Sequence, residues 1–530
     1  MELDLSRLRP VGEFDALQAA VELLRRHRED RIVIVGDFDA DGATSTALMM
    51  LCLGDLNFPE VSFFVPDRFE LGYGLTPEVV ERVLDRDPKL LVTVDNGVTS
   101  VDGVRAARDA GIDVLITDHH LPGDELPDAN AIVNPNLVGD PFAGKYLAGV
   151  GVAFYLLAAL GRSFERPACV VEYLDLVALG TMADLVPLDH SNRILIGEGL
   201  RRIQAGRCRP GVRALCEVSS RSCADVTGET LAYQLAPRLN AAGRLDDMAI
   251  GVRCLTSASD EEARELAAQL DVLNRERRSI EKRMRSEAAE LVDTEELIDS
   301  DGLPPVVCLH REDWHEGIVG LVASRIKDRC HRPVFAFARS GSGVLKGSGR
   351  SIPGFHLRDA LAELDAGTPG LIERFGGHAM AAGLTLSSDN LEPFRVAIET
   401  LGRDRLRPEQ LAQRILTDGE LDADELTVEV AVSLRDAGPW GQGFPEPLFE
   451  GYFELVKQRV VGEKHLKMTV KLPQSNQHFD AIAFNRQSEG WQAGDNLTIV
   501  YRLGLNDYHY GPPIQLIVEH VEHEGIEPGH

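Results

Sequence analysis

The chain has 530 residues, which is too many for a single hydrophobic core and indicates three or four domains. With 44% hydrophobic and 26% charged residues the composition is that of a globular protein, and no run of about 18 uncharged apolar residues is present to form a membrane helix. The net charge of -29 disfavours a polyanionic partner unless a local surface is basic.

The first 200 residues are predicted to alternate strands and helices. Four short apolar segments rich in β-branched residues are candidate strands, and helical patterns such as Pro77–Asp85 and Val101–Ala110 separate them. The candidate strands are Arg31–Val35, Val61–Val65, Leu90–Val94 and Ile112–Thr117. This alternation is typical of a parallel sheet buried on both faces, so we predict an α/β domain.

Residues 257–292 are expected to form one long helix. Ser259 and Glu262 fit a capping box at its start, and the charged stretch that follows contains no Gly or Pro. At about 1.5 Å per residue the helix would span roughly 50 Å. This length favours a bridge between two lobes over the alternative of a simple surface helix.

A second α/β unit is predicted over residues 303–400. It begins with a strand at Pro305–Leu309, continues with a helix at Gly317–Arg329 and returns to a strand at Pro333–Ala338. Residues 341–355 and 376–383 are rich in glycine, and we interpret them as loops. Such loops let the backbone approach an anion closely, although ordinary turns are the common alternative.

The last 120 residues are predicted to be β-structure. The candidate strands are Tyr452–Val461, His465–Leu472, His478–Phe484, Asn496–Leu503 and Pro513–Val521. Five strands separated by turn residues suit a small barrel of the OB type. The segment Gly438–Pro447 is an irregular lead-in to this barrel.

Acidic residues follow three of the predicted strands of the first domain. They are Asp37, Asp39 and Asp41 after the first strand, Asp95 after the third, and Asp118, with His119 and His120, after the fourth. The carboxyl ends of parallel strands lie at one edge of a sheet, so these clusters should converge. A fourth acid, Asp184, lies in the apolar stretch Leu174–Leu188, where a bare carboxylate is costly unless it is paired or bound to metal.

These clusters predict a site for divalent cations. A single Asp after a strand is more often a helix N-cap, but four clusters together favour metal binding. Hard oxygen ligands suit Mg²⁺ or Mn²⁺, and the imidazoles favour Mn²⁺. Two such ions roughly 3.5–4 Å apart clamp a phosphoryl group and activate a water molecule. The predicted chemistry is therefore phosphoester hydrolysis.

Four motifs in this order resemble those of the DHH superfamily of phosphoesterases: GDFDADG (36–42), VDNG (94–97), TDHH (117–120) and GTMADLVPL (180–188). Further segments are similar to the RecJ family within it, nearly from end to end. They include RFELGYGL (68–75), PRLNAAGRLDD (237–247), WHEGIVGLVASRIK (314–327), LKGSGRSIPG (345–354), GGHAMAAGL (376–384) and GPWGQGFPEPLF (438–449).

The resemblance implies an α/β fold. A parallel-sheet DHH domain would be joined by a long helix to a second α/β (DHHA1) domain, followed by a C-terminal β-barrel (OB-like) domain. The implied bounds are 1–200 for the DHH catalytic domain, 201–302 for a helical connector, 303–405 for the DHHA1 substrate-binding domain and 406–530 for the OB-like nucleic-acid-binding domain.

The resemblance also implies roles for individual residues. The ligands of the two metal ions would be Asp37, Asp39, Asp41, Asp95, His119 and Asp184. Asp95 would bridge the ions, His120 would face the substrate phosphate, and Asp118 would orient a neighbouring histidine. Related pyrophosphatases and short-substrate phosphodiesterases carry a His at the position of Val35, and this departure favours the RecJ interpretation.

Further residues are expected to contact DNA or its phosphates, and they come from the connector and the second α/β domain. They are Arg238, Asn240, Arg244, Ser348, Arg350, Ser351, Gly376, Gly377 and His378. The alternative for the arginines near 240 is an ionic network with Asp246 and Asp247. In the barrel, Phe479, Tyr501, Tyr508 and Tyr510 either stack on bases or pack the core.

The activity implied by the resemblance is that of a single-stranded-DNA-specific 5′-to-3′ exonuclease that releases mononucleotides in DNA repair and recombination. The cofactors would be two divalent metal ions, Mn²⁺ or Mg²⁺. Implied partners are single-stranded DNA, a single-strand-binding protein and a RecQ-type helicase, with the protein acting as a monomer away from membranes. The alternatives are a phosphodiesterase acting on short oligoribonucleotides or cyclic dinucleotides, and a non-catalytic replication scaffold.

Local sequence features bear on location and charge. The eight cysteines include no Cys-x-x-Cys pair and the N-terminus has no apolar run flanked by basic residues, so we expect free thiols and a cytoplasmic protein. The resemblance implies that the protein is bacterial. Eight Lys or Arg residues and one acid lie between Arg325 and Arg358, and five Arg and no acid lie between Arg201 and Arg213. These runs are either solvated faces or walls of a basic groove.

Overall fold

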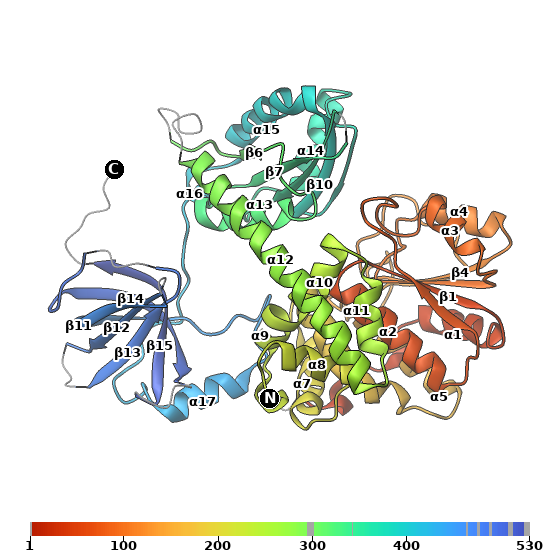
Figure 1. Cartoon of the computed structure of the whole chain (residues 1–530), viewed down its shortest axis with the longest axis horizontal. Helices are drawn as coiled ribbons and strands as arrows, with labels where there is room; N and C mark the ends of the chain where they lie inside the picture. Colours follow the sequence, from red (N-terminus) through yellow and green to blue (C-terminus); the bar gives the residue numbers. More distant parts are fainter. Residues whose placement is uncertain are drawn as a thin grey trace.

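The computed structural model describes residues 3–293, 302–341, 343–462, 465–473, 477–486, 490–506 and 512–523. Figure 1 shows two α/β domains joined by the long helix α12, with a separate barrel at the C-terminal end, as the sequence predicted. Within the described ranges, no helix has the length and apolar character required to cross a membrane.

The first domain is built on a five-stranded parallel sheet with strand order β2-β1-β3-β4-β5. The strands are β1 (Ile32–Gly36), β2 (Val61–Phe64), β3 (Leu90–Val94), β4 (Asp113–Thr117) and β5 (Ala131–Val133). The short strand β5 was not predicted. The strand order reverses between β1 and β3, and ligands of open α/β sheets bind at such a switch point, beyond the carboxyl ends of the strands.

Helices cover both faces of this sheet, which explains why β1 and β3 are buried throughout. On one face, the apolar sides of α3 (Pro77–Leu84) and α4 (Val101–Asp109) pack against the strands. On the other lie α1 (Ala16–Arg26), α2 (Ala40–Asp55) and α5 (Gly149–Ser163). The side chains of Val33, Val35 and Leu91 therefore form a hydrophobic core with the apolar residues of α3 and α4.

A helical region continues the first domain and contains α6 (Leu174–Asp184), which is almost entirely buried between α2 and α7 (His190–Gln204). It is followed by α8 (Pro210–Val218), α9 (Gly228–Thr230), α10 (Ala236–Leu245) and α11 (Ala249–Thr256). Helix α6 is mostly apolar, and its final residue, Asp184, lies at the edge of the core.

Helix α12 (Asp260–Val292) is the predicted bridge between the two α/β domains. Ala263 and Leu270, in its first half, belong to the core of the first domain, whereas Met284 and Ala288 belong to the core of the second. The predicted capping box is only half formed. Ser259 accepts a hydrogen bond from the amide of Glu262, but the Glu262 carboxylate accepts one from the Ser257 hydroxyl instead of from the Ser259 amide.

The second α/β domain has a mixed five-stranded sheet with order β6-β7-β8-β10-β9, in which only β6 and β7 are parallel. Its strands are β6 (Val307–His310), β7 (Val334–Arg339), β8 (Val344–Arg350), β9 (Arg374–Gly377) and β10 (Ala381–Ser387), and its helices are α13 (Val319–Cys330), α14 (Leu357–Gly367) and α15 (Leu391–Arg405). The prediction of loops at the glycine-rich segments is confirmed at residues 351–355 and 378–380 but is wrong over most of the rest, which β8, β9 and β10 occupy. Gly347 and Gly349 lie under the rings of Phe337 and Phe335, where a side chain would collide.

The C-terminal domain is a closed barrel with strand order β11-β12-β13-β15-β14. The strands are β11 (Phe449–Val461), β12 (His465–Lys471), β13 (His478–Ala483), β14 (Asn496–Leu505) and β15 (Ile514–His523), so the five predicted strands are confirmed. Phe479 and Tyr501 are buried in the barrel core with Phe453 and therefore pack the barrel instead of stacking on bases. Tyr508 and Tyr510 lie outside the described residues.

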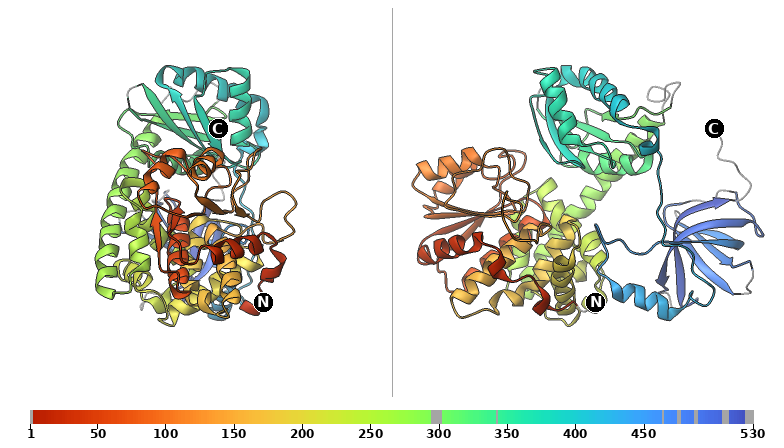
Figure 2. Two further views of the ribbon diagram at one scale, coloured as in Figure 1. Left: turned by 90° about the vertical axis from the view of Figure 1, so that its right-hand side faces the viewer. Right: turned by 180° about the vertical axis from the view of Figure 1, so that it is seen from behind.

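Helix α17 (Val428–Ala437) and the segment that follows it connect the barrel to the first domain. The chain leaves α17, runs past α9 and turns back to enter the barrel at β11, a course that can be followed in Figure 1 and from behind in Figure 2. The segment is thus placed against the helical region that contains α6 and α7.

Candidate metal centre

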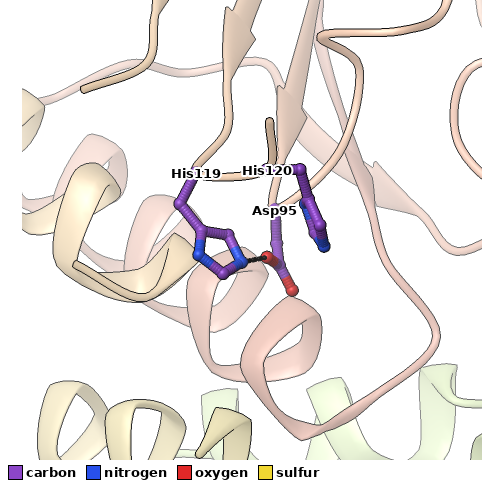
Figure 3. Close-up of side chains that lie close together, drawn as sticks. All are labelled: Asp95, His119 and His120. Carbon is purple, nitrogen blue, oxygen red and sulfur yellow. Dashed lines mark ion pairs between the residues drawn. The ribbon is translucent and has the colours of Figure 1, made fainter. Parts of the chain in front are cut away.

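The four acidic clusters meet at the carboxyl edge of the first sheet. Three sets of side chains there place ligand atoms within 4.8 Å of one another. The sets are Asp95 with His119 and His120, Asp41 with His119 and Asp184, and Asp37 with Asp39 and Asp95. Asp95 and His119 each belong to two sets, so they stand at the centre of the group. Figure 3 shows Asp95 at the end of its strand, between the rings of His119 and His120.

The backbone around Asp95 is strained. Asp95 adopts a left-handed conformation with φ of 62°, which is uncommon for a residue other than glycine. The Asn96 side chain donates hydrogen bonds to the carbonyls of Val35 and Val94, which ties the end of β3 to β1. At Gly149 a methyl group would lie 2.5 Å from Asp95 Oδ1. Strain of this kind is found where a functional side chain must be held in one place.

Three ligand atoms at the centre are buried and have no hydrogen-bond partner among the described residues: Asp95 Oδ1, His119 Nε2 and Asp184 Oδ2. His119 Nε2 lies 3.1 Å from Asp95 Oδ1 and 3.5 Å from Asp184 Oδ2. Adjacent ligands of an octahedral ion, each at about 2.1 Å from it, lie about 3 Å apart. Both the orphaned atoms and their spacing therefore fit a divalent cation.

The carboxyl groups of the centre repel one another. Burial, followed by the charges of neighbouring carboxylates, raises the pKa of Asp37, Asp41 and Asp95 well above its ordinary value. The pKa of Asp184 is also raised, mainly by burial. Burial lowers the pKa of His119, so its imidazole is kept neutral and able to act as a ligand. Bound cations would stabilise this pocket, because they offset the repulsion between its carboxylates.

Two of the candidate ligands also cap helices. Asp39 is the N-cap of α2 and accepts the amide of Gly42 at 3.0 Å. The two oxygens of Asp41 accept the amides of Gly149 and Val150 at 2.6 and 2.9 Å, at the start of α5. The N-cap interpretation weighed for an isolated Asp thus holds for Asp39, whereas Asp41 lies within α2 and binds the first amides of α5. Both residues also belong to the groups that can bind a cation.

Asp118 lies behind the two histidines. It accepts the amides of Val98, His119 and His120, and it is 2.7 Å from His120 Nδ1. Burial lowers the pKa of His120, but the hydrogen bond and the charge of Asp118, with further acids nearby, outweigh this effect and raise the pKa to about 9. His120 is therefore a cationic donor at neutral pH, held in place by Asp118.

The second α/β domain reaches the centre through His378. The rings of His378 and His120 stack with centroids 6.0 Å apart and planes inclined by 13°. From the first domain, the Tyr73 hydroxyl lies 3.3 Å from His120 Nδ1 and 3.4 Å from the Asp95 carbonyl. Both α/β domains thus contribute to one site, in which His120 is contacted by His378 of the second domain and by Tyr73 of the first.

Three guanidinium groups gather beside the carboxylates: Arg68, Arg244 and Arg350. Burial, followed by the charges of Arg68 and Arg350, lowers the pKa of Arg244 to about 9. Burial and then Arg68 also lower the pKa of Arg350. Buried guanidinium groups that repel one another form a binding site for an anion, because the anion neutralises their charge. Ser348 accepts a hydrogen bond from Arg350 at 3.0 Å and lies at the same site.

Arg68 and Tyr73 were not singled out from the sequence, although both lie in the segment RFELGYGL that carries part of the resemblance. Arg68 also covers the ring of Phe38, with its guanidinium carbon 4.5 Å from the ring centroid. In the sequence, only the position of Arg68 and Tyr73 within this motif pointed to a functional role, since neither residue follows a strand of the sheet.

Some predicted contact residues have other partners. The guanidinium of Arg238 is bonded to the carboxylate of Asp271 at 2.9 Å, so it forms an ionic contact, though not with Asp246 or Asp247. The Ser351 hydroxyl is buried and donates to the Phe355 carbonyl. Asn240 accepts the amide of Ala40 at 2.8 Å and so supports the loop that carries Asp37 and Asp39. Gly376 and Gly377 belong to β9 and pair with β10.

The two basic runs differ in their surroundings. Arg325 borders a recess of about 440 Å³, which Asn240 and Arg244 also line and which is otherwise mostly basic: Arg277, Arg278, Lys282 and Arg285 lie on its wall. Between Arg201 and Arg213, by contrast, several arginines are paired with acids: Arg201 with Glu198, Arg202 with Glu172, and Arg213 with Asp260. Arg325, Lys327, Arg329 and Lys346 of the first run are also paired with acids, namely Glu281, Asp328, Asp293 and Glu316. Both runs are therefore largely ion-paired faces, and the basic wall of the recess comes mainly from α12.

Three family models match the chain: "DHH family, N-terminal domain" over residues 31–181, "DHHA1 domain" over 304–402 and "RecJ OB domain" over 417–520. The chain is 49% identical to the single-stranded-DNA-specific exonuclease RecJ of Salmonella typhimurium, over 98% of this chain and 92% of that protein. It is 52% identical to the Dickeya dadantii protein of the same name, over 95% of this chain and 89% of that protein. The crystal structure of Thermus thermophilus RecJ in complex with Mn²⁺ superposes with a TM-score of 0.83 at 30% identity, covering 100% of this chain and 74% of that one.

Proposed function

Because the chain belongs to the RecJ family of single-stranded-DNA-specific exonucleases, we propose that it hydrolyses single-stranded DNA from the 5′ end and releases mononucleotides. It is a metal-dependent exonuclease, as its relatives with Mn²⁺ and Mg²⁺ indicate. The observation that carries the proposal is the convergence of three orphaned ligand atoms, from Asp95, His119 and Asp184.

In this proposal Asp37, Asp39, Asp41, Asp95, His119 and Asp184 hold two divalent cations. When bound, the ions supply an activated water molecule and stabilise the charge that develops on the phosphate. Asp95 would contribute to both ions, because it belongs to two of the three sets of candidate ligands. Asn96 ties the end of β3 to β1, and Gly149 leaves room for the Asp95 carboxylate. Asp41 keeps this arrangement rigid through its bonds to the start of α5.

His120 is proposed to donate a hydrogen bond to the scissile phosphate. Its Nδ1 is bonded to Asp118, which favours the protonated ring, so Nε2, which lies 3.4 Å from the Tyr73 hydroxyl, is the nitrogen proposed to face the substrate. Stacking of His378 on this ring brings the second α/β domain to the same phosphate. Substitution of His120 would therefore slow hydrolysis while leaving the metal ligands in place.

The guanidinium groups of Arg68, Arg244 and Arg350 are proposed to bind the phosphate at the 5′ end of the strand. They lie beside the carboxylates of the metal centre, and Arg68 is subject to the charges of Asp37 and Asp39. A terminal phosphate carries more negative charge than an internal one, so it suits three clustered arginines. This pocket supports cleavage from the 5′ end.

The variant Arg350→Gln is expected to raise KM for 5′-phosphorylated single strands by about tenfold, as the loss of one charge-assisted hydrogen bond predicts. KM for strands with a 5′-hydroxyl should change by much less, since they place no terminal phosphate there. Steady-state kinetics on the two substrates measure this difference. An equal change in both would contradict the assignment of the pocket, and Arg339→Gln, on the same sheet but exposed, provides the control.

The direction of cleavage is tested with long single strands labelled at the 5′ or the 3′ end, incubated with and without Mn²⁺. Early release of a labelled mononucleotide from the 5′-labelled strand alone supports the proposal. Release from the 3′ label would overturn the direction. Preference for a dinucleotide over the long strand would favour a phosphodiesterase of short substrates, and loss of all activity in the presence of metal would favour a scaffold.

We further propose that the protein acts in DNA repair and recombination with a single-strand-binding protein and a RecQ-type helicase, by analogy with its family. We also propose that it works as a monomer in the bacterial cytoplasm. Light scattering coupled to size-exclusion chromatography tests the oligomeric state, and co-sedimentation with a single-strand-binding protein tests that partner.

A further inference from the structure

The carboxylate of Asp184 has an unusual position for a candidate metal ligand, because it is the last residue of α6. The C-terminal end of a helix carries partial negative charge, which repels a carboxylate. The next residue, Leu185, is left-handed with φ of 60°, and its side chain is 59% exposed. Asp184 is thus the point at which the chain leaves α6, and the turn at residues 185–189 sets the course of the chain next to it.

That turn, residues 185–189, is contacted by the segment that precedes the barrel, residues 438–447, which we call the latch. The amide of Leu188 donates a hydrogen bond to the carbonyl of Gln442 at 2.7 Å. The latch approaches closely because it has glycine at these positions: a methyl group on Gly441 would lie 2.8 Å from Leu188 Cδ1, and one on Gly443 would lie 3.3 Å from Pro187 Cβ. The backbone of the turn and that of the latch are thus in direct contact.

The latch is held in one conformation. The rings of Trp440 and Phe444 stack with centroids 4.9 Å apart, and Gly441 and Phe444 exchange two backbone hydrogen bonds of 2.9 and 3.0 Å. Arg193, on α7, lies over the Phe444 ring at 3.8 Å and donates to the Ala437 carbonyl at 2.8 Å. Phe444 also packs against the core of the first domain. The latch is therefore clamped to the helix that follows the turn.

The other end of the latch is fixed to the barrel and to the first domain at the same time. Arg502, on β14, pairs with Glu446 of the latch at 3.1 Å and with Glu229, in α9, at 3.3 Å. The course of the chain past α9 is visible in Figure 1. A continuous set of contacts therefore runs from the barrel through the latch to the turn after Asp184.

We propose that the latch is a positioning element of the metal centre: it fixes the turn at residues 185–189 and thereby directs the Asp184 carboxylate toward His119. This proposal rests on the proposed role of Asp184 as a metal ligand. It makes the geometry of the metal centre depend on a segment more than 250 residues away in the chain, which also carries the barrel. If the latch served only as a tether, it would affect the binding of long strands and leave the metal centre unchanged.

The test uses the full-length protein and the variant Phe444→Ala, which removes the ring clamped by Arg193. Manganese binding to chelator-treated protein is measured by isothermal titration calorimetry. The expected result is an affinity about tenfold lower than in the unsubstituted protein, the effect typical of a lost supporting contact around a metal ligand. The rate of hydrolysis at saturating concentration of a four-nucleotide strand should fall by a similar factor. Phe444→Tyr keeps the ring and should restore both values.

A double-mutant cycle separates an effect through Asp184 from a general loss of structure. Manganese binding is compared in Phe444→Ala, Asp184→Asn and the double variant. If the latch acts through Asp184, Phe444→Ala should weaken binding in the unsubstituted background and have no further effect in Asp184→Asn. An equal loss in both backgrounds would overturn the proposal, as would unchanged manganese affinity in Phe444→Ala with KM raised for long strands alone.

Matched controls separate this proposal from the proposed function. Arg435→Ala lies on α17, where Arg435 pairs with Asp436 and does not contact the turn, and it should leave manganese binding unchanged. If Asp184→Asn itself binds manganese as tightly as the unsubstituted protein, the assignment of Asp184 as a ligand fails. If Asp184→Asn weakens binding and Phe444→Ala does not, the ligand assignment stands and the latch proposal fails.

Discussion

Replacement of Asp95 by Asn is expected to reduce hydrolysis of single-stranded DNA by about 10³-fold or more, because several kcal/mol of charge stabilisation by metal would be lost. Asn has the same shape as Asp and tolerates the left-handed conformation that residue 95 adopts, so the fold should be retained. Binding of single strands, measured by fluorescence anisotropy, should persist, since the arginines and the barrel are untouched. Multiple-turnover digestion of a 5′-labelled strand with Mn²⁺ measures the loss.

The same substitution is expected to stabilise the metal-free protein. Burial and the charges of Asp41, Asp39, Asp37 and Asp184 disfavour an ionised Asp95, and a neutral side chain removes this repulsion. The Tm of chelator-treated Asp95→Asn should therefore exceed that of the unsubstituted protein by about 2 °C or more. Asp102→Asn is the control, because Asp102 is exposed and pairs only with Arg105 among the ion pairs of the described residues. If Asp95→Asn hydrolysed single-stranded DNA at a rate within tenfold of that of the unsubstituted protein, the assignment of Asp95 to the metal site would be refuted.

Removal of the metal is the second change with a large expected effect. Treatment with a chelator should reduce hydrolysis to background, and added Mn²⁺ should restore it, because the ions held by this centre would supply the activated water. Metal should also raise Tm, since an ion that binds only the folded state stabilises it. If the protein remained active after dialysis against chelator, its hydrolysis would not depend on the proposed metal centre.

The stability of the metal-free protein should depend on pH with a defined sign. The pKa values of Asp37, Asp41, Asp95 and Asp184 are raised in the folded state, so this state keeps protons that the unfolded chain releases above about pH 4. The free energy of unfolding should therefore fall as the pH rises from about 4 through these raised values. Thermal unfolding at a series of pH values, with and without Mn²⁺, measures this.

The gain in Tm from Mn²⁺ is expected to increase with pH over the same range, because the cation replaces the protons that the carboxylates would otherwise keep. The gain should be smaller at every pH in Asp95→Asn, which lacks one of the repelling charges. A gain that stayed constant between about pH 5 and pH 8 would show that these carboxylates are not the metal ligands.

The sequence by itself determined the parallel sheet, the long bridging helix and the C-terminal barrel. Each is encoded by local patterns: β-branched segments alternating with helices, an uninterrupted charged helix from Asp260 to Val292, and five spaced strands. It also placed the acidic clusters, because residues that follow parallel strands share one edge of the sheet whatever the loops do. Asp95 and His119 could therefore be assigned to one site from the sequence, whereas Asp184, in an apolar helix, was assigned to it by the cost of a bare carboxylate there and by the resemblance.

The tertiary structure alone decided which of the other polar residues belong to that site. Arg238 and Ser351 lie in motifs of the family, but partners elsewhere in the fold, Asp271 and the Phe355 carbonyl, occupy their polar atoms. Arg68 enters the site because its loop folds over the sheet edge, and no periodicity marks it. The contact between Leu188 and Gln442 joins segments that are far apart in the chain. Such contacts depend on how whole domains pack, and local sequence patterns carry no information about that packing.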